Sequence, residues 1–201
     1  MEGGNPAAKI VDTETRRAIY AQLKVAAREQ TQKNFTRFIK TKPALDNWDG
    51  TVLRSMQPEA RKYARVEWPK YYNSSGKFNG FEKGWEELYQ KYSHRPSFFD
   101  LAIWQRIGDE DVLQGLCLGR PSRAKTHLSL HWIERSFAPT YMRGGILDPI
   151  IDCALQYAKL LGCERLLIKN PIDTTIYDRY GFRPCKVPKA RGDYLSKELK
   201  L

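Results

Sequence analysis

The sequence has little of what marks a membrane-spanning, secreted or zinc-binding protein. No apolar run in its 201 residues approaches the roughly 20 residues of a membrane-spanning helix. It has four cysteines, none in a C-x-x-C pair, and its three histidines add no zinc-like spacing. We therefore expect reduced, mostly buried thiols and no metal. The first residues, MEGGNPAAKIVDTETRR, lack the basic-then-apolar order of a signal peptide, which predicts a cytoplasmic protein without membrane contact.

Acidic residues are also scarce relative to basic ones. The chain has 34 Lys and Arg against 23 Asp and Glu, a formal net charge of +11. Such an excess favours anionic partners, namely nucleic acid, an anionic cofactor or an acidic substrate. A solvated basic surface without a specific partner explains the same count equally well.

Residues 1–95 are predicted to form a helical N-terminal region packed on the rest of the protein. Helical spacing of apolar residues covers 13–39, a second helix starts near Pro58 and stops before Pro69, and a third covers 81–92. No strand can be placed in this region from the pattern. The basic, aromatic stretch ARKYARVEWPKYY would suit single-stranded nucleic acid, or it packs its aromatic rings inward and solvates its lysines.

Residues 96–201 change to a strand period and predict a mixed sheet with helices packed on it. The expected strands cover 98–106, 112–119, 126–137 and 165–170, followed by a hairpin of RPCKVP with DYLSKEL. A helix with one apolar stripe covers 147–161, and a short helix covers 173–181.

The turn before the 147–161 helix is a candidate anion site. Arg143, Gly144, Gly145 and Ile146 lie between a strand and a helix start. Glycines let the backbone approach a ligand, and free N–H groups with the helix dipole favour an anion such as a pyrophosphate. The alternative is a tight turn that serves packing only.

Two motifs in order resemble the GNAT superfamily of acyl-CoA-dependent N-acyltransferases. Pro139, Thr140 and Tyr141 match its P-x-Y/H segment, and residues 142–147 fall on R/Q-x-x-G-x-G/A. Asn170, Tyr177, Gly181 and Phe182 match its second motif in register. The resemblance covers about residues 98–199. It implies an α/β (α+β) fold, with a mixed, mostly antiparallel sheet flanked by helices. Met142, Leu147 and Asp148 depart from the pattern, and Asp148 would repel a pyrophosphate that Arg143 could hold.

The resemblance also implies a cofactor and residue roles. Acetyl-CoA, or another acyl-CoA, would be the co-substrate, with no metal. The backbone amides of Arg143, Gly144, Gly145 and Ile146 would hold the pyrophosphate, and Phe137 would contribute to cofactor binding. Asn170 would reach the pantetheine arm, or else bond a loop backbone. Tyr177 would contact the cofactor and protonate its thiolate as general acid, or else pack under the sheet.

The candidates for general base are Glu134 and His131. They are three residues apart, so they point to opposite faces of a strand unless a bulge intervenes. Alternation places Glu134 with Leu128, Leu130 and Trp132, and His131 with Ser129 and Ile133. A surface ion pair for Glu134 and a hydrogen-bonded structural role for His131 are the simpler alternatives. Asp100 is a third, weaker candidate.

These observations predict an N-acyltransferase that moves an acyl group from coenzyme A to an amine through a ternary complex. The net charge suggests an acidic protein region or an aminoacyl-tRNA as acceptor, and a homodimer is compatible with the sequence. The alternative is a non-catalytic GNAT-fold module that binds nucleic acid or a protein partner through its basic surface.

Overall fold

A computed structural model describes residues 6–41, 49–72, 81–138, 142, 145–188 and 190–199. Seven strands form one sheet in the order β1-β2-β3-β4-β5-β7-β6. Their bounds are β1 (Thr51–Arg54), β2 (Phe99–Ile107), β3 (Glu110–Pro121), β4 (His127–Arg135), β5 (Arg165–Lys169), β6 (Arg183–Cys185) and β7 (Tyr194–Glu198). β4 and β5 are parallel, and every other neighbouring pair is antiparallel. The predicted mixed, mostly antiparallel sheet is therefore confirmed.

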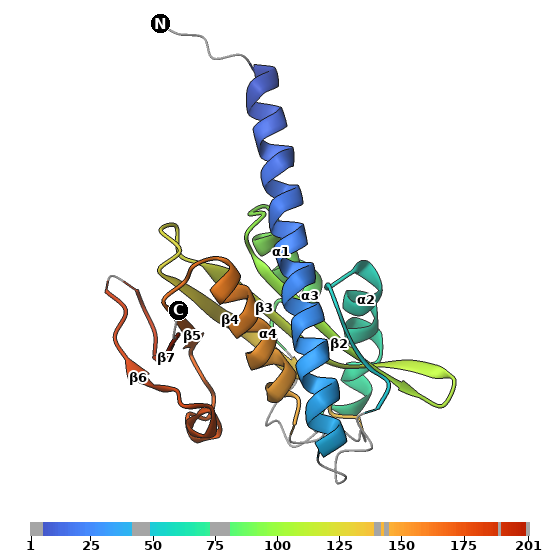
Figure 1. The fold of residues 1–201 in the computed structure, drawn as a ribbon. Helices are drawn as coiled ribbons and strands as arrows, with labels where there is room; N and C mark the ends of the chain where they lie inside the picture. Colours follow the sequence, from blue (N-terminus) through green and yellow to red (C-terminus); the bar gives the residue numbers. More distant parts are fainter. Residues whose placement is uncertain are drawn as a thin grey trace, which may run out of the picture.

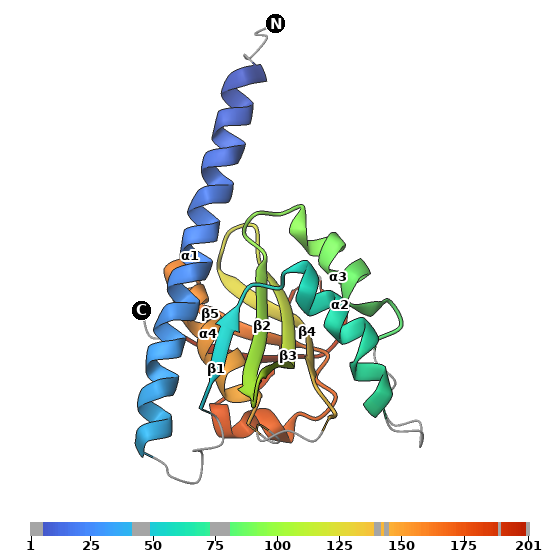
Figure 2. The same cartoon turned by 90° about the vertical axis from the view of Figure 1, so that its right-hand side faces the viewer.

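Helices cover both faces of this sheet. The α-helices are α1 (Pro6–Thr41), α2 (Pro58–Val66), α3 (Gly84–Ser93) and α4 (Leu147–Leu160), and the 3₁₀ helices are η2 (Trp68–Tyr71) and η3 (Thr175–Tyr180). α1 and α4 lie side by side on one face, and α2 and α3 lie on the other (Figures 1 and 2). Within the described ranges, no helix combines the length and apolarity needed to cross a membrane.

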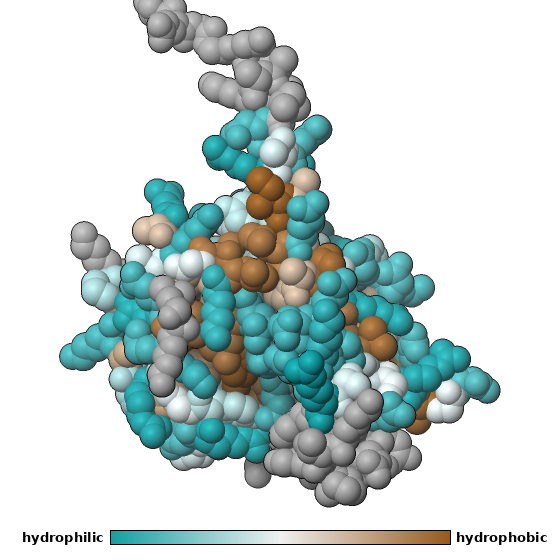
Figure 3. Space-filling view, viewed as in Figure 1, coloured by the Kyte–Doolittle hydropathy of each residue, from teal (hydrophilic) through white to brown (hydrophobic). Residues whose placement is uncertain are grey.

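The N-terminal part of α1 extends beyond the rest of the protein (Figure 1). Ala27, Thr31 and Phe35 in its C-terminal half are buried, whereas Ile19 and Val25 are exposed. Apolar side chains also gather in the space-filling view where the helix leaves the domain (Figure 3). α1 is therefore held to the domain mainly by its C-terminal half.

Alternating side chains of the central strands build two hydrophobic cores. Leu101 and Ile103 of β2 face the core under α1 and α4, while Ala102 and Trp104 face the core under α2 and α3. A strand whose two faces are both buried reads as a continuous apolar run, as FFDLAIW does. Below, we call these two sides the α4 face and the α3 face.

β1 is an edge strand that sequence analysis did not locate. Its Thr51 and Leu53 are buried, Val52 and Arg54 are exposed, and the strand pairs with β2 in antiparallel register. Four residues between irregular segments carry too little alternation to be recognised. The described part of residues 1–95 thus supplies a strand of the sheet as well as three α-helices and the 3₁₀ helix η2.

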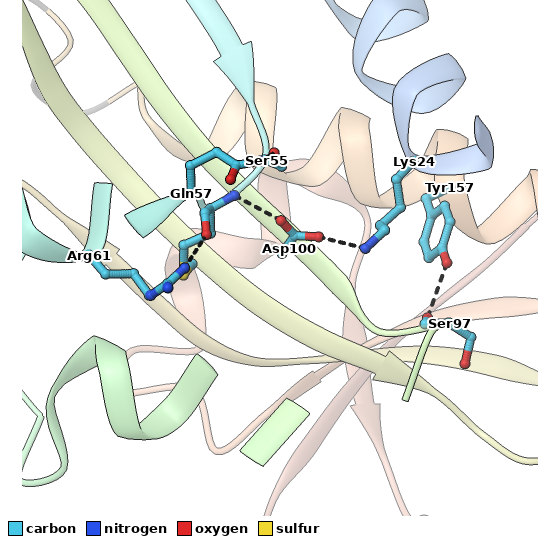
Figure 4. A network of polar contacts seen from close by, with 8 residues as sticks. Lys24, Ser55, Gln57, Arg61, Ser97, Asp100 and Tyr157 are labelled. Atoms are coloured by element: carbon cyan, nitrogen blue, oxygen red, sulfur yellow. Dashed lines mark hydrogen bonds and ion pairs between the residues drawn. The ribbon is translucent and has the colours of Figure 1, made fainter. Parts of the chain in front are cut away.

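A buried carboxylate fastens α1 to the sheet, as Figure 4 shows. Asp100, 2% exposed, accepts hydrogen bonds from Lys24 Nζ at 2.9 Å and from the Met56 backbone N–H at 2.8 Å. Arg61 extends this network by donating a hydrogen bond to the Met56 carbonyl oxygen at 2.6 Å. Both oxygens of Asp100 are therefore engaged in joining α1, β2 and the segment before α2, which is a structural role.

Candidate active site

The sheet opens into a fork where β4 and β5 separate. These parallel strands pair only over residues 127–130 and 165–168. β4 then continues to Arg135 along β3, and its register shifts so that Leu118 faces Trp132 while Gly119 faces Leu130. His131 is the extra residue of this β-bulge. Beyond the bulge, the β4 edge that faces β5 has no strand partner within the described residues.

The bulge brings His131 and Glu134 to the same face of the sheet. Both contact residues of α3, through Tyr92 and Trp85 respectively. Leu128 and Leu130 belong to the opposite core, so the expectation that Glu134 shares their face is wrong. Ile133 also packs on the α4 face, so its predicted placement with His131 is wrong too. One extra residue resets the alternation of side chains for the rest of the strand.

Glu134 is a buried carboxylate held by two donors. Its side chain is 4% exposed, and it accepts from the Tyr72 hydroxyl at 2.7 Å and the Trp85 indole N–H at 2.6 Å. Burial raises the pKa of Glu134 to about 7, although the bonds from Tyr72 and Trp85 act in the opposite direction. It forms no ion pair with any described residue, so the surface ion pair is ruled out.

His131 is also held by α3. The Tyr92 hydroxyl lies 2.7 Å from its Nδ1 and accepts from the Trp132 indole N–H at 3.2 Å. Burial lowers the pKa of His131 to about 3, and the positive charges of Arg120 and Lys169 add to this. Such a ring is neutral at physiological pH and accepts a proton poorly. Of the two candidates, Glu134 has the pKa that suits a general base.

Tyr177 approaches the fork from the α4 face. It lies on η3, is 6% exposed and packs edge-to-face against Phe182 with ring centroids 6.0 Å apart. Burial raises the pKa of Tyr177 to about 12, so the phenol keeps its proton at neutral pH. Its hydroxyl makes no hydrogen bond within the part of the chain that the structure describes. Tyr177 therefore packs in the core, as one alternative predicted, and still has a proton to donate.

Asn170 closes the end of β5 onto the loop before β7. Its Oδ1 accepts from the Asp193 N–H at 3.0 Å, and its own N–H donates to the Asp193 carbonyl at 2.8 Å. Gly192, at φ +98°, permits this approach, because a Cβ there would lie 2.2 Å from Asn170 Oδ1. The predicted bond to a loop backbone is present, while the pantetheine role stays a prediction.

The glycine turn is only partly described. Arg143, Gly144 and residues 139–141 lie outside the described residues, so the backbone cradle stays a prediction. Gly145 and Ile146 are buried at the start of α4, where Ile146 packs against Gly115. Met142, at the motif's Arg or Gln position, is 2% exposed and accepts a bond from Thr51 Oγ1 at 3.7 Å. The side chain at position 142 therefore contributes to the packing of the core.

Two further predicted positions lie near the end of β4 and the start of α4. The Phe137 ring contacts Tyr72 edge-on, with centroids 6.0 Å apart, and lies 4.6 Å from the Arg135 guanidinium carbon. Asp148 accepts from the Tyr180 hydroxyl at 2.9 Å and lies 4.0 Å from Arg179. Arg179 of η3 thus offsets the charge of Asp148.

The partners of Glu134 and His131 were missed from the sequence. Trp85 and Tyr92 lie on α3, and Tyr72 directly follows η2. The signals were the aromatic density of FEKGWEELYQKY and of ARKYARVEWPKYY, neither of which says which ring meets which strand. Across the described ranges, no cluster of three or more His, Cys, Asp or Glu side chains is placed to hold a metal ion.

Comparison with known proteins identifies the fold through structure. The sequence matches no protein-family model and no curated protein. The structure is similar to a GNAT-family acetyltransferase from Staphylococcus aureus Mu50, with TM-score 0.56 and 12% identity over 75% of this chain and 99% of that chain. It is also similar to Ard1 from Thermoplasma volcanium (TM-score 0.50, 10% identity, 76% and 99% covered). The ribosomal-protein-S18-alanine N-acetyltransferase from Escherichia coli gives TM-score 0.50 and 11% identity, with 75% and 95% covered. The chain therefore has the fold of the GNAT superfamily, as its two motifs implied.

Proposed function

We propose that this protein is an N-acyltransferase that moves an acyl group from coenzyme A to an amine, with both substrates bound at once. Glu134 is the general base and Tyr177 the general acid. The observation that carries the proposal is a buried carboxylate beside a bulged, forked strand, with a pKa near neutrality. The similar structures named above include acetyltransferases, which supports acetyl as the acyl group.

Several features of the chain fit an acyl-CoA thioester. The β4 edge beyond the bulge leaves backbone groups for an extended ligand to bond. Gln114 is 2% exposed and close to the end of β4, since its carbonyl accepts from Ser136 N at 2.7 Å. Neither side-chain polar atom of Gln114 has a hydrogen-bond partner within the described residues. The backbone amides of Arg143, Gly144 and Ile146 would hold the pyrophosphate, since the Gly145 N–H already donates to the Met142 carbonyl at 3.0 Å.

The proposed base and the proposed acid lie on opposite faces of the fork, and each moves one proton. The bound acyl-CoA supplies the acyl group as a thioester. The amine attacks in its neutral form, and Glu134, on the α3 face, takes the proton that the nitrogen loses as the C–N bond forms. Tyr177, on the α4 face, gives its phenolic proton to the sulfur as the C–S bond breaks. One proton thus leaves the nitrogen for Glu134 and one reaches the sulfur from Tyr177. Glu134 then releases its proton to solvent and the Tyr177 phenolate takes one up, so both groups return to their starting forms.

The test is coenzyme A release from acetyl-CoA in the presence of a panel of amines. We expect Glu134→Gln to lower kcat by about 10²–10⁴-fold and to abolish the rise of the wild-type rate near pH 7. Tyr177→Phe should lower kcat with little change in KM for acetyl-CoA. Tyr63→Phe, which removes a hydroxyl from α2, is the matched control. Full activity in Glu134→Gln would refute this assignment of the base.

A non-catalytic module is the second candidate. The burial of Met142, at a position where the motif has Arg or Gln, favours it. A folded protein that binds nucleic acid in a salt-sensitive way, without releasing coenzyme A with any amine, would support this alternative.

A further inference from the structure

A cavity of about 240 Å³ lies on the α3 face, at the opposite end of β4 from the glycine turn. Four segments distant in sequence line it: the loop after α3, the β3–β4 connection, β4 itself, and the chain around the start of β7. Its chemically informative residues are Arg95, Arg120, Arg123, Ser129, His131 and Tyr194. The cavity is therefore separate from the predicted pyrophosphate site.

The three arginines of this cavity have no counter-charge. None of the described residues that line it is acidic. None of the three guanidinium groups forms an ion pair with a described carboxylate, whereas Arg54, Arg61 and others elsewhere do. All three residues are solvent-exposed, so water screens their mutual repulsion, and an anionic ligand in the cavity they line would be attracted by each of them. Arginine is also the side chain best shaped to bind carboxylate or phosphate oxygens in pairs.

The ring of His131 lines the same cavity as the three arginines and lies near their positive charge. Burial lowers the pKa of His131 most, and the positive charges of Arg120 and Lys169 lower it further. If Tyr92 donates to Nδ1, the neutral ring carries its proton on Nε2 and adds a donor to the cavity wall. The cavity thus combines cationic groups with a neutral donor, and none of its described lining residues is acidic.

His131 is the bulge residue, so the cavity lies beside the fork. The cavity is also on the face of the sheet that holds Glu134, opposite the face that holds Tyr177. An amine that approaches the thioester from the Glu134 side would extend its remaining atoms along this face. A group attached to the amine would then meet the three arginines.

We propose that this cavity binds the anionic end of the amine acceptor, so that the substrates are small amines carrying a phosphate or a carboxylate. The acceptor role rests on the proposed function, whereas anion binding rests on the cavity alone. A volume of about 240 Å³ is below the roughly 300–1,000 Å³ of sites for drug-sized ligands, which favours a compact head group over a polymer.

The first experiment measures binding without acyl-CoA. Inorganic phosphate and O-phosphoethanolamine are titrated calorimetrically into the full chain and into Arg120→Ala and Arg123→Ala. We expect at least tenfold weaker binding in each variant and no change in Arg65→Ala, an exposed arginine on α2. Equal affinity in all variants, or no phosphate binding by the folded wild type, would overturn the anion site.

The second experiment measures turnover with acetyl-CoA. O-phosphoethanolamine, β-alanine and ethanolamine present the same primary amine with a phosphate, a carboxylate or no anion. We expect kcat/KM at least tenfold higher for one of the anionic amines, and loss of that preference in Arg120→Ala. The more active of the two anionic amines identifies the anion.

The outcomes separate the two proposals. Turnover without any anionic preference leaves the acyltransferase standing and overturns the acceptor site. Phosphate binding without turnover of any amine supports the anion site and overturns the proposed function, together with the acceptor role. A short single-stranded RNA that displaces phosphate and binds more tightly would overturn the small-amine assignment in favour of nucleic acid.

Discussion

Replacing Glu134 by Gln should stabilise the protein at alkaline pH, although it removes the proposed base. The amide has nearly the volume of the carboxylate. Its Oε1 can accept from the Trp85 N–H, and its Nε2 can donate to the Tyr72 hydroxyl oxygen. The bond from Trp85 is thus kept and the bond with Tyr72 is replaced by one of opposite direction, while the buried charge is removed. The variant therefore isolates the free-energy cost of ionising this side chain inside the fold.

The magnitude follows from the pKa of Glu134, which burial raises from 4.5 to about 7. Each unit corresponds to about 1.4 kcal/mol, so the ionised side chain costs roughly 3 kcal/mol of the free energy of unfolding. Between pH 4.5 and 7 the folded protein keeps a proton that the unfolded chain has released, so stability falls as pH rises through this window. Above pH 7 the full cost is present, and below pH 4.5 it is absent.

The assay is urea unfolding of wild type and Glu134→Gln at pH 4.5 and pH 8. The variant should gain about 3 kcal/mol relative to wild type on moving to the higher pH. Glu59→Gln, at an exposed position of α2, is the control for general charge effects and should show no comparable gain. A stability difference that does not change with pH would refute the claim that Glu134 is a strained, ionisable group.

Three further predictions concern the scaffold. Lys24→Ala leaves the buried carboxylate of Asp100 without its cation and should lower the free energy of unfolding by about 3–5 kcal/mol, with partial recovery in the double variant with Asp100→Asn. Gly119→Ala places a Cβ 2.5 Å from the Ser129 carbonyl oxygen and should destabilise by roughly 1–3 kcal/mol in thermal unfolding, because neither strand can move away freely. Cys185 should react with iodoacetamide before the other three thiols in native protein, as peptide mass spectrometry would show, because those three are buried.

The secondary structure of residues 96–201 is predicted well from the sequence because the patterns that determine it are local. Hairpins join neighbouring strands, the helix at 147–161 carries a full apolar stripe, and each segment is long enough to show its period. β1 was missed because four residues carry too little pattern and their partner, β2, lies some distance along the chain. Pairings of that kind are determined by packing.

The bulge is the feature that sequence reading could not place. The stretch THLSLHWIERSF alternates from Leu128 to Trp132, but Trp132 and Ile133 are adjacent apolar residues. Strict alternation continued past this point places Glu134 with Leu128 and Leu130, which lie on the opposite face. The cause lies on the neighbouring strand: Gly119, without a Cβ, lets the Ser129 carbonyl oxygen approach, and the register shifts at this glycine. The signal was present as a glycine inside a predicted strand, but its effect on β4 is visible only once the two strands are paired.

A buried glutamate at position 134 stabilises the fold less than an apolar residue would, and this supports a functional role for Glu134. Its cross-strand partner is Leu116, and its surroundings are the aromatic side chains of Tyr72 and Trp85, so an apolar residue would pack there without the cost of a buried charge. Two donors from the N-terminal region instead hold the carboxylate in place. Sites that break the local rules of packing are expected where a protein acts on a ligand. Residues 1–95 therefore complete the α3 side of the fork: they hold the proposed base and contribute Arg95 to the proposed acceptor cavity.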